Sequence, residues 1–125
     1  NEVESRVSLV SEVLAIRKLM VSNQRQIAQE GPIVMVGRDI GSVVLPNAGK
    51  KIYLDASVRT RALRRSKDTE YKTLADVMKD IIARDKTDSE RIHAPLRVPE
   101  GAYAIDTNTM TIDQVVYEIT EYINK

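Results

Sequence analysis

The sequence predicts an α/β protein with a parallel sheet, and three observations support this fold class. Segments with helical periodicity alternate along the chain with short apolar runs rich in β-branched residues. Gly, Pro or Asn residues bound these short runs, which is typical of strands. Charged residues follow the apolar run 33–36 directly, and open parallel sheets bind ligands at the carboxyl ends of their strands. We therefore expect right-handed crossovers within one small domain of 125 residues.

Periodicity and turn residues place the elements along the chain. Apolar residues recur at helical spacing from Val7 to Ile27, and Gly31-Pro32 ends this pattern. The predicted strands are residues 33–36, 51–55 and 102–106. Residues from about 87 to 101 include two prolines and are predicted to be irregular.

Three further helices are predicted from their N-terminal caps. Ser57 is the expected N-cap of a helix that follows the second strand. Thr73 and Asp76 have the spacing of a capping box, and so do Thr111 and Gln114. The apolar residues expected to face the core are Leu74, Val77, Met78, Ile81 and Ile82 in one helix and Ile112, Val115, Val116, Ile119 and Ile123 in the last.

Composition limits the classes of function. The chain has 19 Lys and Arg residues against 18 Asp and Glu, and this net charge of +1 argues against a general nucleic-acid or membrane-surface binder. It contains no cysteine, so disulfides and thiolate metal sites are excluded. No apolar run is long enough to cross a bilayer. We therefore expect a cytoplasmic protein with a local basic site and with neither nucleic-acid nor membrane partners.

Arg38 and Asp39 are the first candidates for a binding site. They follow the predicted strand 33–36 without an intervening loop, and Gly37 and Gly41 flank them. An Arg-Asp pair at such a place is often only a solvated turn. Flanking glycines permit a tight turn and the close approach of a ligand, so we favour a functional role.

A second charged cluster contains Arg84, Asp88 and Arg91, which share one helical face if the helix extends that far. Two interpretations remain open. The residues could form a ladder of ion pairs that contributes little to stability. Alternatively, Asp88 accepts hydrogen bonds from ribose hydroxyls while the arginines bind phosphate oxygens. The second interpretation, taken with Arg38 and Asp39, suits a nucleoside monophosphate.

Other polar residues are less informative on their own. Arg61, Arg64 and Arg65 form either a solvated helix face or a mobile arm that covers transferring phosphates. Spacing alone would assign Ser8 and Arg17 to the surface as an ordinary hydroxyl and an ordinary cation.

The chain resembles the bacterial-type cytidylate (CMP) kinases in motifs that follow that family's order. The sequences Gly-Arg-Asp-Ile-Gly at 37–41 and Arg-Asp-x-x-Asp-x-x-Arg at 84–91 are highly specific when both occur. The other matches are Val7-Ser8, Arg17, Gln24-Arg25, Ser42-Val43-Val44, residues 51–57, Arg61-Ala62, Arg64-Arg65, Ala94-Pro95-Leu96 and Ile105-Asp106-Thr107. The resemblance implies the fold of P-loop nucleoside monophosphate kinases, in which helices flank a parallel sheet in three layers. It also implies transfer of the γ-phosphoryl group of ATP to CMP and dCMP.

The resemblance implies which residues bind the acceptor nucleoside. Ser8, Arg17 and Asp39 would read the cytosine ring. Asp88 would hold the ribose, and its acceptor oxygens would favour a sugar with a free 2′-hydroxyl.

The residues that the resemblance assigns to phosphates are arginines. On the acceptor side they are Arg38, Arg84 and Arg91. On the ATP side they are Arg61, Arg64 and Arg65, within a lid region of about residues 57–86. Those expected to contribute to catalysis are Arg38, Arg84, Arg61 and Arg65.

The chain lacks the phosphate-binding loop of that family. No Gly-x-x-x-x-Gly-Lys-[Ser/Thr] sequence occurs, although this loop cradles ATP phosphates and supplies a hydroxyl to Mg²⁺. In the family, the strand that carries the loop lies between the strands corresponding to 33–36 and 52–54. We therefore expect residues 1–125 to be an incomplete kinase core, inactive alone, whose missing part is absent or comes from another segment or chain. Mg²⁺ would accompany ATP in the complete protein, which is expected to be a monomer, and no metal ligand is expected in this chain.

Two classes of function remain open. In the first, the complete protein is a (d)CMP kinase that acts by positioning and charge neutralisation. In the second, the chain is a non-catalytic nucleotide-binding or structural domain derived from the same fold. The number of Arg and Asp residues suited to phosphate and sugar favours the enzyme.

Overall fold

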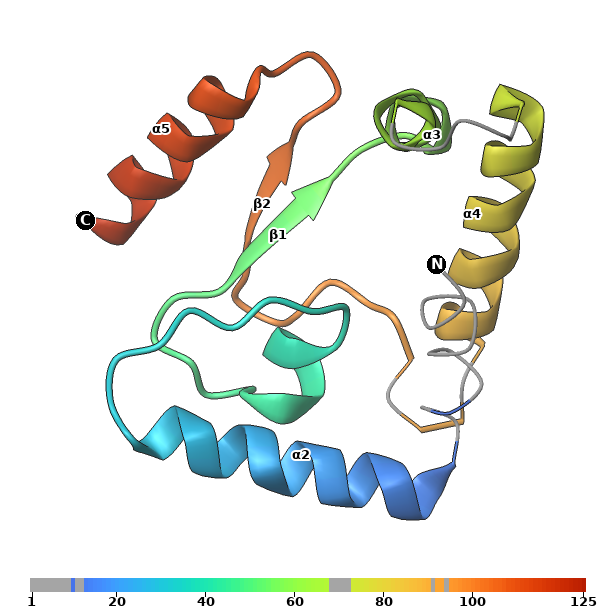
Figure 1. Cartoon of the computed structure of the whole chain (residues 1–125). Coiled ribbons are helices and arrows are strands. Elements are labelled where there is room, and N and C mark those ends of the chain that lie inside the picture. The colour runs from blue at the N-terminus through green and yellow to red at the C-terminus, as the bar shows by residue number, and fades with distance from the viewer. Residues whose placement is uncertain (1–9, 11–12, 68–72, 91, 94) are drawn as a thin grey trace. The chain divides into compact units, whose positions relative to one another are not determined.

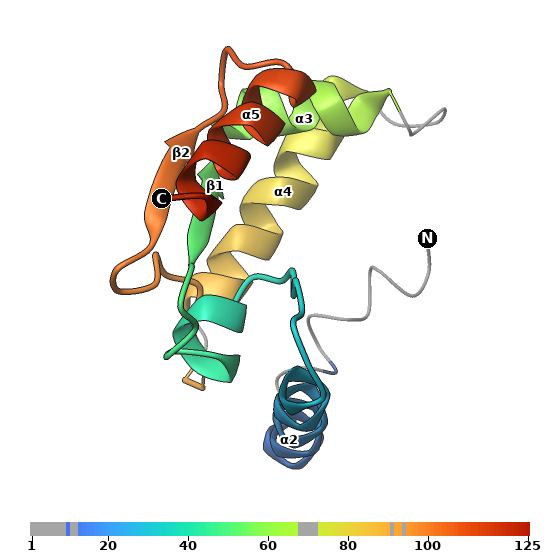
Figure 2. The same cartoon turned by 90° about the vertical axis from the view of Figure 1, so that its left-hand side faces the viewer.

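The computed structural model describes residue 10 and residues 13–67, 73–90, 92–93 and 95–125. The chain divides into two compact units. The first contains residues 1–48 and 84–100, and the second contains residues 49–83 and 101–125. The described elements are α2 (Leu14–Gln29), η1 (Ile40–Val44), β1 (Ile52–Asp55), α3 (Val58–Ser66), α4 (Leu74–Ser89), β2 (Tyr103–Asp106) and α5 (Ile112–Ile123), shown in Figure 1 and, from a second side, in Figure 2. Helix α4 begins in the second unit and ends in the first.

Helix α2 of the first unit confirms the predicted helix and its stop. It ends at Gln29, two residues before Gly31-Pro32. None of its residues is fully buried, and Leu19 is 62% exposed. The apolar residues that predict this helix are therefore only partly covered by the described part of the chain.

The prediction of a strand at residues 33–36 is wrong for this structure. The segment pairs with no strand among the described residues. Val34 and Val36 are 88% and 90% exposed. A parallel strand needs a hydrogen-bonded neighbour, because its backbone N–H and C=O groups are otherwise left to water. The segment has the composition of a buried strand, but the described residues supply no partner strand for it.

A short π-helix that was not predicted from the sequence, η1, follows this segment. Gly37 precedes it, and a Cβ at this position would lie 2.8 Å from Cγ1 of Ile40. Ile40 itself is nearly buried, at 9% exposure. We expected this glycine to make room for a ligand, whereas its missing side chain makes room for Ile40.

Arg25 fixes the other end of η1 from helix α2. Its Nε donates to the carbonyl of Val44, and its Nη2 donates to that of Val43, both at 2.9 Å. These are C-terminal carbonyls of η1, which helices leave without internal partners. The backbone that carries Arg38 and Asp39, immediately before η1, is therefore anchored on both sides.

The second unit contains a two-stranded parallel sheet, which confirms two of the three predicted strands. Strands β1 and β2 pair in register from Ile52 opposite Tyr103 to Asp55 opposite Asp106. Both views show the two strands side by side (Figures 1 and 2). The parallel α/β class is therefore confirmed for this unit, with two strands. The three-layer sheet that the resemblance implies remains a prediction.

All three predicted caps are present. Ser57 accepts a hydrogen bond of 3.1 Å from a backbone N–H in the first turn of α3. Thr73 and Asp76 exchange side-chain to backbone hydrogen bonds of 3.2 and 3.3 Å. Thr111 and Gln114 form a full capping box at the start of α5. These caps involve residues only three positions apart, and such local signals are well specified by sequence.

The predicted inward faces are only partly right. In α4, Val77 is buried at 2% exposure, but Ile82 is 51% exposed. In α5, Ile112 is 82% exposed, Val116 is 55% exposed and Ile123 is 49% exposed. Periodicity identifies an apolar face, but it does not supply the surface that covers the face. Among the described residues, this face of α5 is not fully covered.

Aromatic and polar contacts attach α5 to the sheet. The ring of Tyr103 on β2 stacks on Tyr122 with 4.5 Å between the centroids, and Nζ of Lys50 lies 4.7 Å from the Tyr122 ring. The hydroxyl of Tyr103 donates a hydrogen bond to Glu118. This hydrogen bond, then desolvation and the nearby negative charge, raise the pKa of Tyr103 above its ordinary value of 10.0.

Candidate functional site

The described candidate residues of the first unit come from three places in the fold. Arg17 lies on α2, Arg38 and Asp39 directly precede η1, and Arg84 and Asp88 lie near the end of α4. Because α4 runs to Ser89, Arg84 and Asp88 share a helical face. Arg91, the third residue expected on this face, lies outside the described residues.

Arg38 binds two carboxylates of α4 at once. Its Nη1 lies 2.5 Å from Oδ2 of Asp88, and its Nη2 donates to Oδ1 of Asp85. The Arg38 side chain is 32% exposed. A guanidinium is suited to this position because its planar fork presents several N–H groups in a fixed direction. Arg38, which lies just before η1, therefore joins two parts of the chain that are distant in sequence.

Asp88 is the buried centre of this cluster. Its side chain is only 2% exposed, and Nε of Arg84 lies 3.9 Å from the same Oδ2 that Arg38 contacts. This longer contact is an ion pair and not a hydrogen bond. The predicted ladder between Arg84 and Asp88 is thus present, but Arg38 is the closer cation. A buried carboxylate must be paired, so the two arginines stabilise the charge of Asp88.

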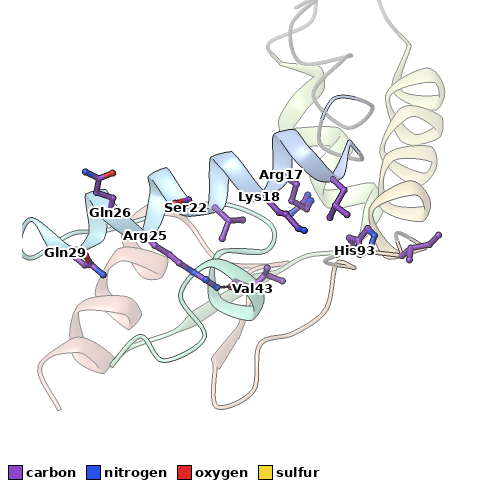
Figure 3. Close-up of a pocket in the computed structure, with 11 residues that line it drawn as sticks. Arg17, Lys18, Ser22, Arg25, Gln26, Gln29, Val43 and His93 are labelled. Carbon is purple, nitrogen blue, oxygen red and sulfur yellow. Dashed lines mark hydrogen bonds between the residues drawn. The ribbon is translucent and has the colours of Figure 1, made fainter.

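Arg17 and Asp39 form a second ion pair. Nη1 of Arg17 lies 2.5 Å from Oδ2 of Asp39, and the two side chains are 11% and 20% exposed. Arg17 also lines a pocket of about 650 Å³ along α2, shown in Figure 3 together with Val43 and His93. The described residues that line this pocket include the basic side chains Arg17, Lys18, Arg25 and His93 and no carboxylate.

The arginines of α3 lie in the second unit, where two of them bind backbone oxygens. Nε of Arg61 donates to the carbonyl of Ala56 at 3.0 Å. Arg64 donates to Oγ1 of Thr107 at 3.0 Å and to its carbonyl at 2.5 Å. Arg65 is exposed. In this structure Arg64 therefore joins α3 to the end of β2, and the predicted lid role of the three arginines remains a prediction.

Two predicted residues, Ser8 and Arg91, lie outside the described residues.

Two described residues were given no role from the sequence and have one in the structure. Asp85 binds Arg38, and Arg25 anchors η1. Asp85 could have been identified from its spacing of three residues to Asp88, which places both on the same side of α4.

Within the described ranges, no three Asp, Glu or His side chains are placed to bind one metal ion. In the same part of the chain, no helix is both long and apolar enough to cross a membrane.

Comparison with known proteins identifies the family. The family model described as cytidylate kinase matches residues 1–125. The chain is 45% identical to the cytidylate kinase of Geobacillus sp. (strain WCH70), over 99% of this chain and 57% of that protein. It is 43% identical to the cytidylate kinase of Bacillus licheniformis, over 100% of this chain and 57% of that protein. For the cytidylate kinase of Limosilactobacillus reuteri (strain DSM 20016) the identity is 46%, over 99% of this chain and 57% of that protein.

The chain thus spans somewhat more than half the length of the curated relatives that it matches. The similarity extends over the whole of the sequence given, including both charged motifs. By the match of the family model along its full length, this chain belongs to the cytidylate kinase family.

Proposed function

We propose that the complete protein containing this chain is a nucleoside monophosphate kinase that transfers the γ-phosphoryl group of ATP to CMP and dCMP. The observation that carries this proposal is the cluster of Arg38, Arg84 and Asp88, in which a buried carboxylate lies between two guanidinium groups. Such a cluster offers acceptor oxygens to sugar hydroxyls and N–H donors to phosphate oxygens. Membership of the family supports the same chemistry.

The acceptor nucleotide would bind in the first unit. Asp88 would accept hydrogen bonds from the ribose, and Arg38 and Arg84 would bind the phosphate, together with Arg91. The Nε of Arg84 is buried and makes no hydrogen bond within the described residues, so it is available to an incoming acceptor oxygen. The phosphate oxygens of a monophosphate are acceptors of this kind.

The cytosine ring would be read by Asp39, Arg17 and Ser8. The pair of Arg17 and Asp39 places a donor and an acceptor side by side, at 2.5 Å. Cytosine presents a carbonyl, a ring nitrogen and an exocyclic amine on one edge, which needs donors and acceptors together. Ion pairing between the two side chains would hold them in place before the base arrives.

The donor side of the reaction lies mainly outside this chain. Arg61, Arg64 and Arg65 would bind the transferring phosphates, and Arg38 and Arg84 would neutralise charge on the acceptor side. ATP and its Mg²⁺ would be held by a phosphate-binding loop that this sequence does not contain. We therefore propose that this chain alone does not catalyse the transfer.

A coupled assay of ADP formation tests this proposal. The complete protein is expected to phosphorylate CMP in preference to UMP and AMP, whereas the 125-residue chain has no measurable turnover. Turnover by the rigorously purified chain would contradict the proposed role of the missing loop. Equal rates with CMP, UMP and AMP would contradict the proposed reading of cytosine.

One observation favours binding by the chain without catalysis. The cluster around Asp88 and the pair of Arg17 with Asp39 are both formed by residues of this chain. Calorimetric titration of the chain with CMP would measure that binding directly. A chain that binds CMP without turnover would support the second class of function for the chain itself.

A further inference from the structure

Both terminal nitrogens of Arg38 are engaged by carboxylates. Nη1 contacts Asp88 at 2.5 Å, and Nη2 donates to Asp85. A phosphate is bound most strongly by an arginine through two parallel N–H groups of its fork. Arg38 cannot present that terminal fork to a phosphate while both carboxylates hold it. A phosphate oxygen that takes the place of a carboxylate on one of these nitrogens requires that carboxylate to leave.

Burial decides which of the two leaves. The Asp88 side chain is 2% exposed, and water does not reach it well enough to replace its ion pairs. Asp88 also has a second cation at 3.9 Å, Arg84, which stays with it when Arg38 moves. The Asp85 side chain is 25% exposed, so water can solvate its carboxylate after release.

From this geometry we propose that Asp85 determines phosphate affinity by competing with the ligand phosphate for Arg38. The inference rests on the function proposed above. Without a ligand, Arg38 is paired with Asp85 and Asp88, and Arg84 is paired with Asp88. An arriving phosphate takes the place of the Asp85 carboxylate on Nη2, and no covalent bond changes. This competition lowers the affinity of the site for phosphate alone.

This competition opposes the binding of nucleotides and of simple phosphate anions alike. Every phosphate must displace Asp85, and only a ligand that also binds elsewhere in the site recovers the lost affinity. A nucleoside monophosphate does so through its sugar and base, whereas inorganic phosphate does not. Asp85 therefore lowers the affinity of the acceptor site for every ligand that carries a phosphate, and inorganic phosphate, which makes no sugar or base contact, stays a weak ligand.

The test is calorimetric titration of the complete protein and of its Asp85→Asn variant. The side chain of Asn has nearly the same shape as that of Asp but carries no charge to compete for Arg38. We expect the affinities for CMP and for inorganic phosphate to rise about three- to tenfold, the size of a partly exposed ion pair. The affinity for cytidine, which has no phosphate, is expected to stay unchanged.

Glu90→Gln is the matched control. It removes one negative charge from the same end of α4, at a side chain that is 67% exposed and lies 4.0 Å from Lys86. We expect this variant to bind CMP, inorganic phosphate and cytidine as the unmodified protein does. An equal gain in both variants would show a general effect of net charge and would overturn the proposal.

Other outcomes also decide the matter. Unchanged or weaker phosphate binding by Asp85→Asn overturns the proposal, as does an equal change for CMP and cytidine. If the unmodified protein does not prefer CMP to cytidine, the proposed function fails, and the titration with inorganic phosphate still tests Asp85.

Should Asp85→Asn not fold, the ¹³C signal of the Asp85 carboxyl group in the unmodified protein is followed instead. Phosphate is expected to move that signal and not the Glu90 signal, and an unmoved Asp85 signal at saturation overturns the proposal.

Discussion

Two neighbouring parts of the first unit invert the usual distribution of polarity. Asp88 is a charged residue at 1% exposure, and it and Val44 have the largest fully buried side chains among the described residues. Val34 and Val36 are apolar, and they are 88% and 90% exposed. Carboxylates are rarely this buried unless they are paired, and valines are among the residues most often buried.

This difference in exposure follows from where each part finds its interaction partners. Asp88 pairs with Arg38 and Arg84, two residues of this chain, and so the charged cluster is formed. The segment 33–36 needs backbone partners on a neighbouring strand, and the described residues provide none. A site made of side-chain contacts is thus present in the same unit as a segment that pairs with no described strand. The following experiments test the buried charged cluster and the exposed segment 33–36 separately.

The largest expected effect comes from removing the partner of the buried carboxylate. Arg38→Ala removes the guanidinium that lies 2.5 Å from Oδ2 of Asp88, and breaking a buried ion pair on one side costs about 3–5 kcal/mol. We expect the free energy of unfolding, measured with urea, to fall by about 3 kcal/mol. The double variant Arg38→Ala with Asp88→Asn is expected to recover part of the loss, because no charge is then left buried. A single variant as stable as the parent would show that Asp88 is better solvated than the structure indicates.

A smaller but more specific effect is expected from Asp88→Asn in the complete protein. Losing a hydrogen bond to a charged acceptor costs about 1.5–3 kcal/mol, or about 10- to 150-fold in kcat/KM for CMP. The KM for ATP is expected to stay unchanged, since the ribose contact belongs to the acceptor. Discrimination between CMP and dCMP is expected to narrow as well. Equal losses for ATP and CMP in steady-state kinetics would argue against a ribose role for Asp88.

The parts that could be predicted from sequence are those held by local interactions or by specific motifs. The caps at Ser57 and Thr111 depend on residues three positions apart and were predicted correctly. Arg38 and Asp88 were identified because the two charged motifs occur together. The contact of Arg38 with Asp85 was missed, because a sequence does not show how close in space two segments lie when they are distant along the chain.

Elements whose partners lie far along the chain were predicted less well. The strand expected at 33–36 was wrong, because β-branched composition indicates a preference for burial and not the presence of a neighbouring strand. Similarly, the periodicity of α5 placed Ile112 and Val116 on one face, but both are exposed. Composition and periodicity describe one side of a contact, and the other side has to be supplied by the rest of the fold.

The exposed segment can be tested with Val36→Thr, which changes the polarity and nearly keeps the shape. In the 125-residue chain, a substitution at a side chain that is 90% exposed should change the free energy of unfolding by at most about 0.5 kcal/mol. In the complete protein we expect a loss of about 1–3 kcal/mol, because a hydroxyl would be buried against a neighbouring strand.

The control for this pair of measurements is Val44→Thr. Val44 is 2% exposed within the chain, so the same change should cost about 1–3 kcal/mol in both proteins. An equal, small effect of Val36→Thr in the two proteins would show that residues 33–36 remain exposed in the complete protein. The idea that a strand is missing beside them would then be wrong.

The smallest expected effect concerns a carboxylate contact in the second unit, which resembles that of Asp88 but is open to water. Tyr103, 36% exposed, donates a hydrogen bond to Glu118, which is the main cause of its raised pKa. Because the folded pKa lies above the ordinary value of 10.0, this contact stabilises the fold fully below pH 10.0, and the contribution is lost as pH rises through the folded pKa.

Absorbance titration of the tyrosinates should show one tyrosine that ionises later than the others. Tyr103→Phe is expected to remove that late transition, and Glu118→Gln is expected to shift it to lower pH, because the acceptor loses its negative charge. Both variants should change the stability at neutral pH only slightly, since solvent screens an exposed contact. A loss as large as that of Arg38→Ala would mean that exposure does not decide how much these two carboxylate contacts contribute.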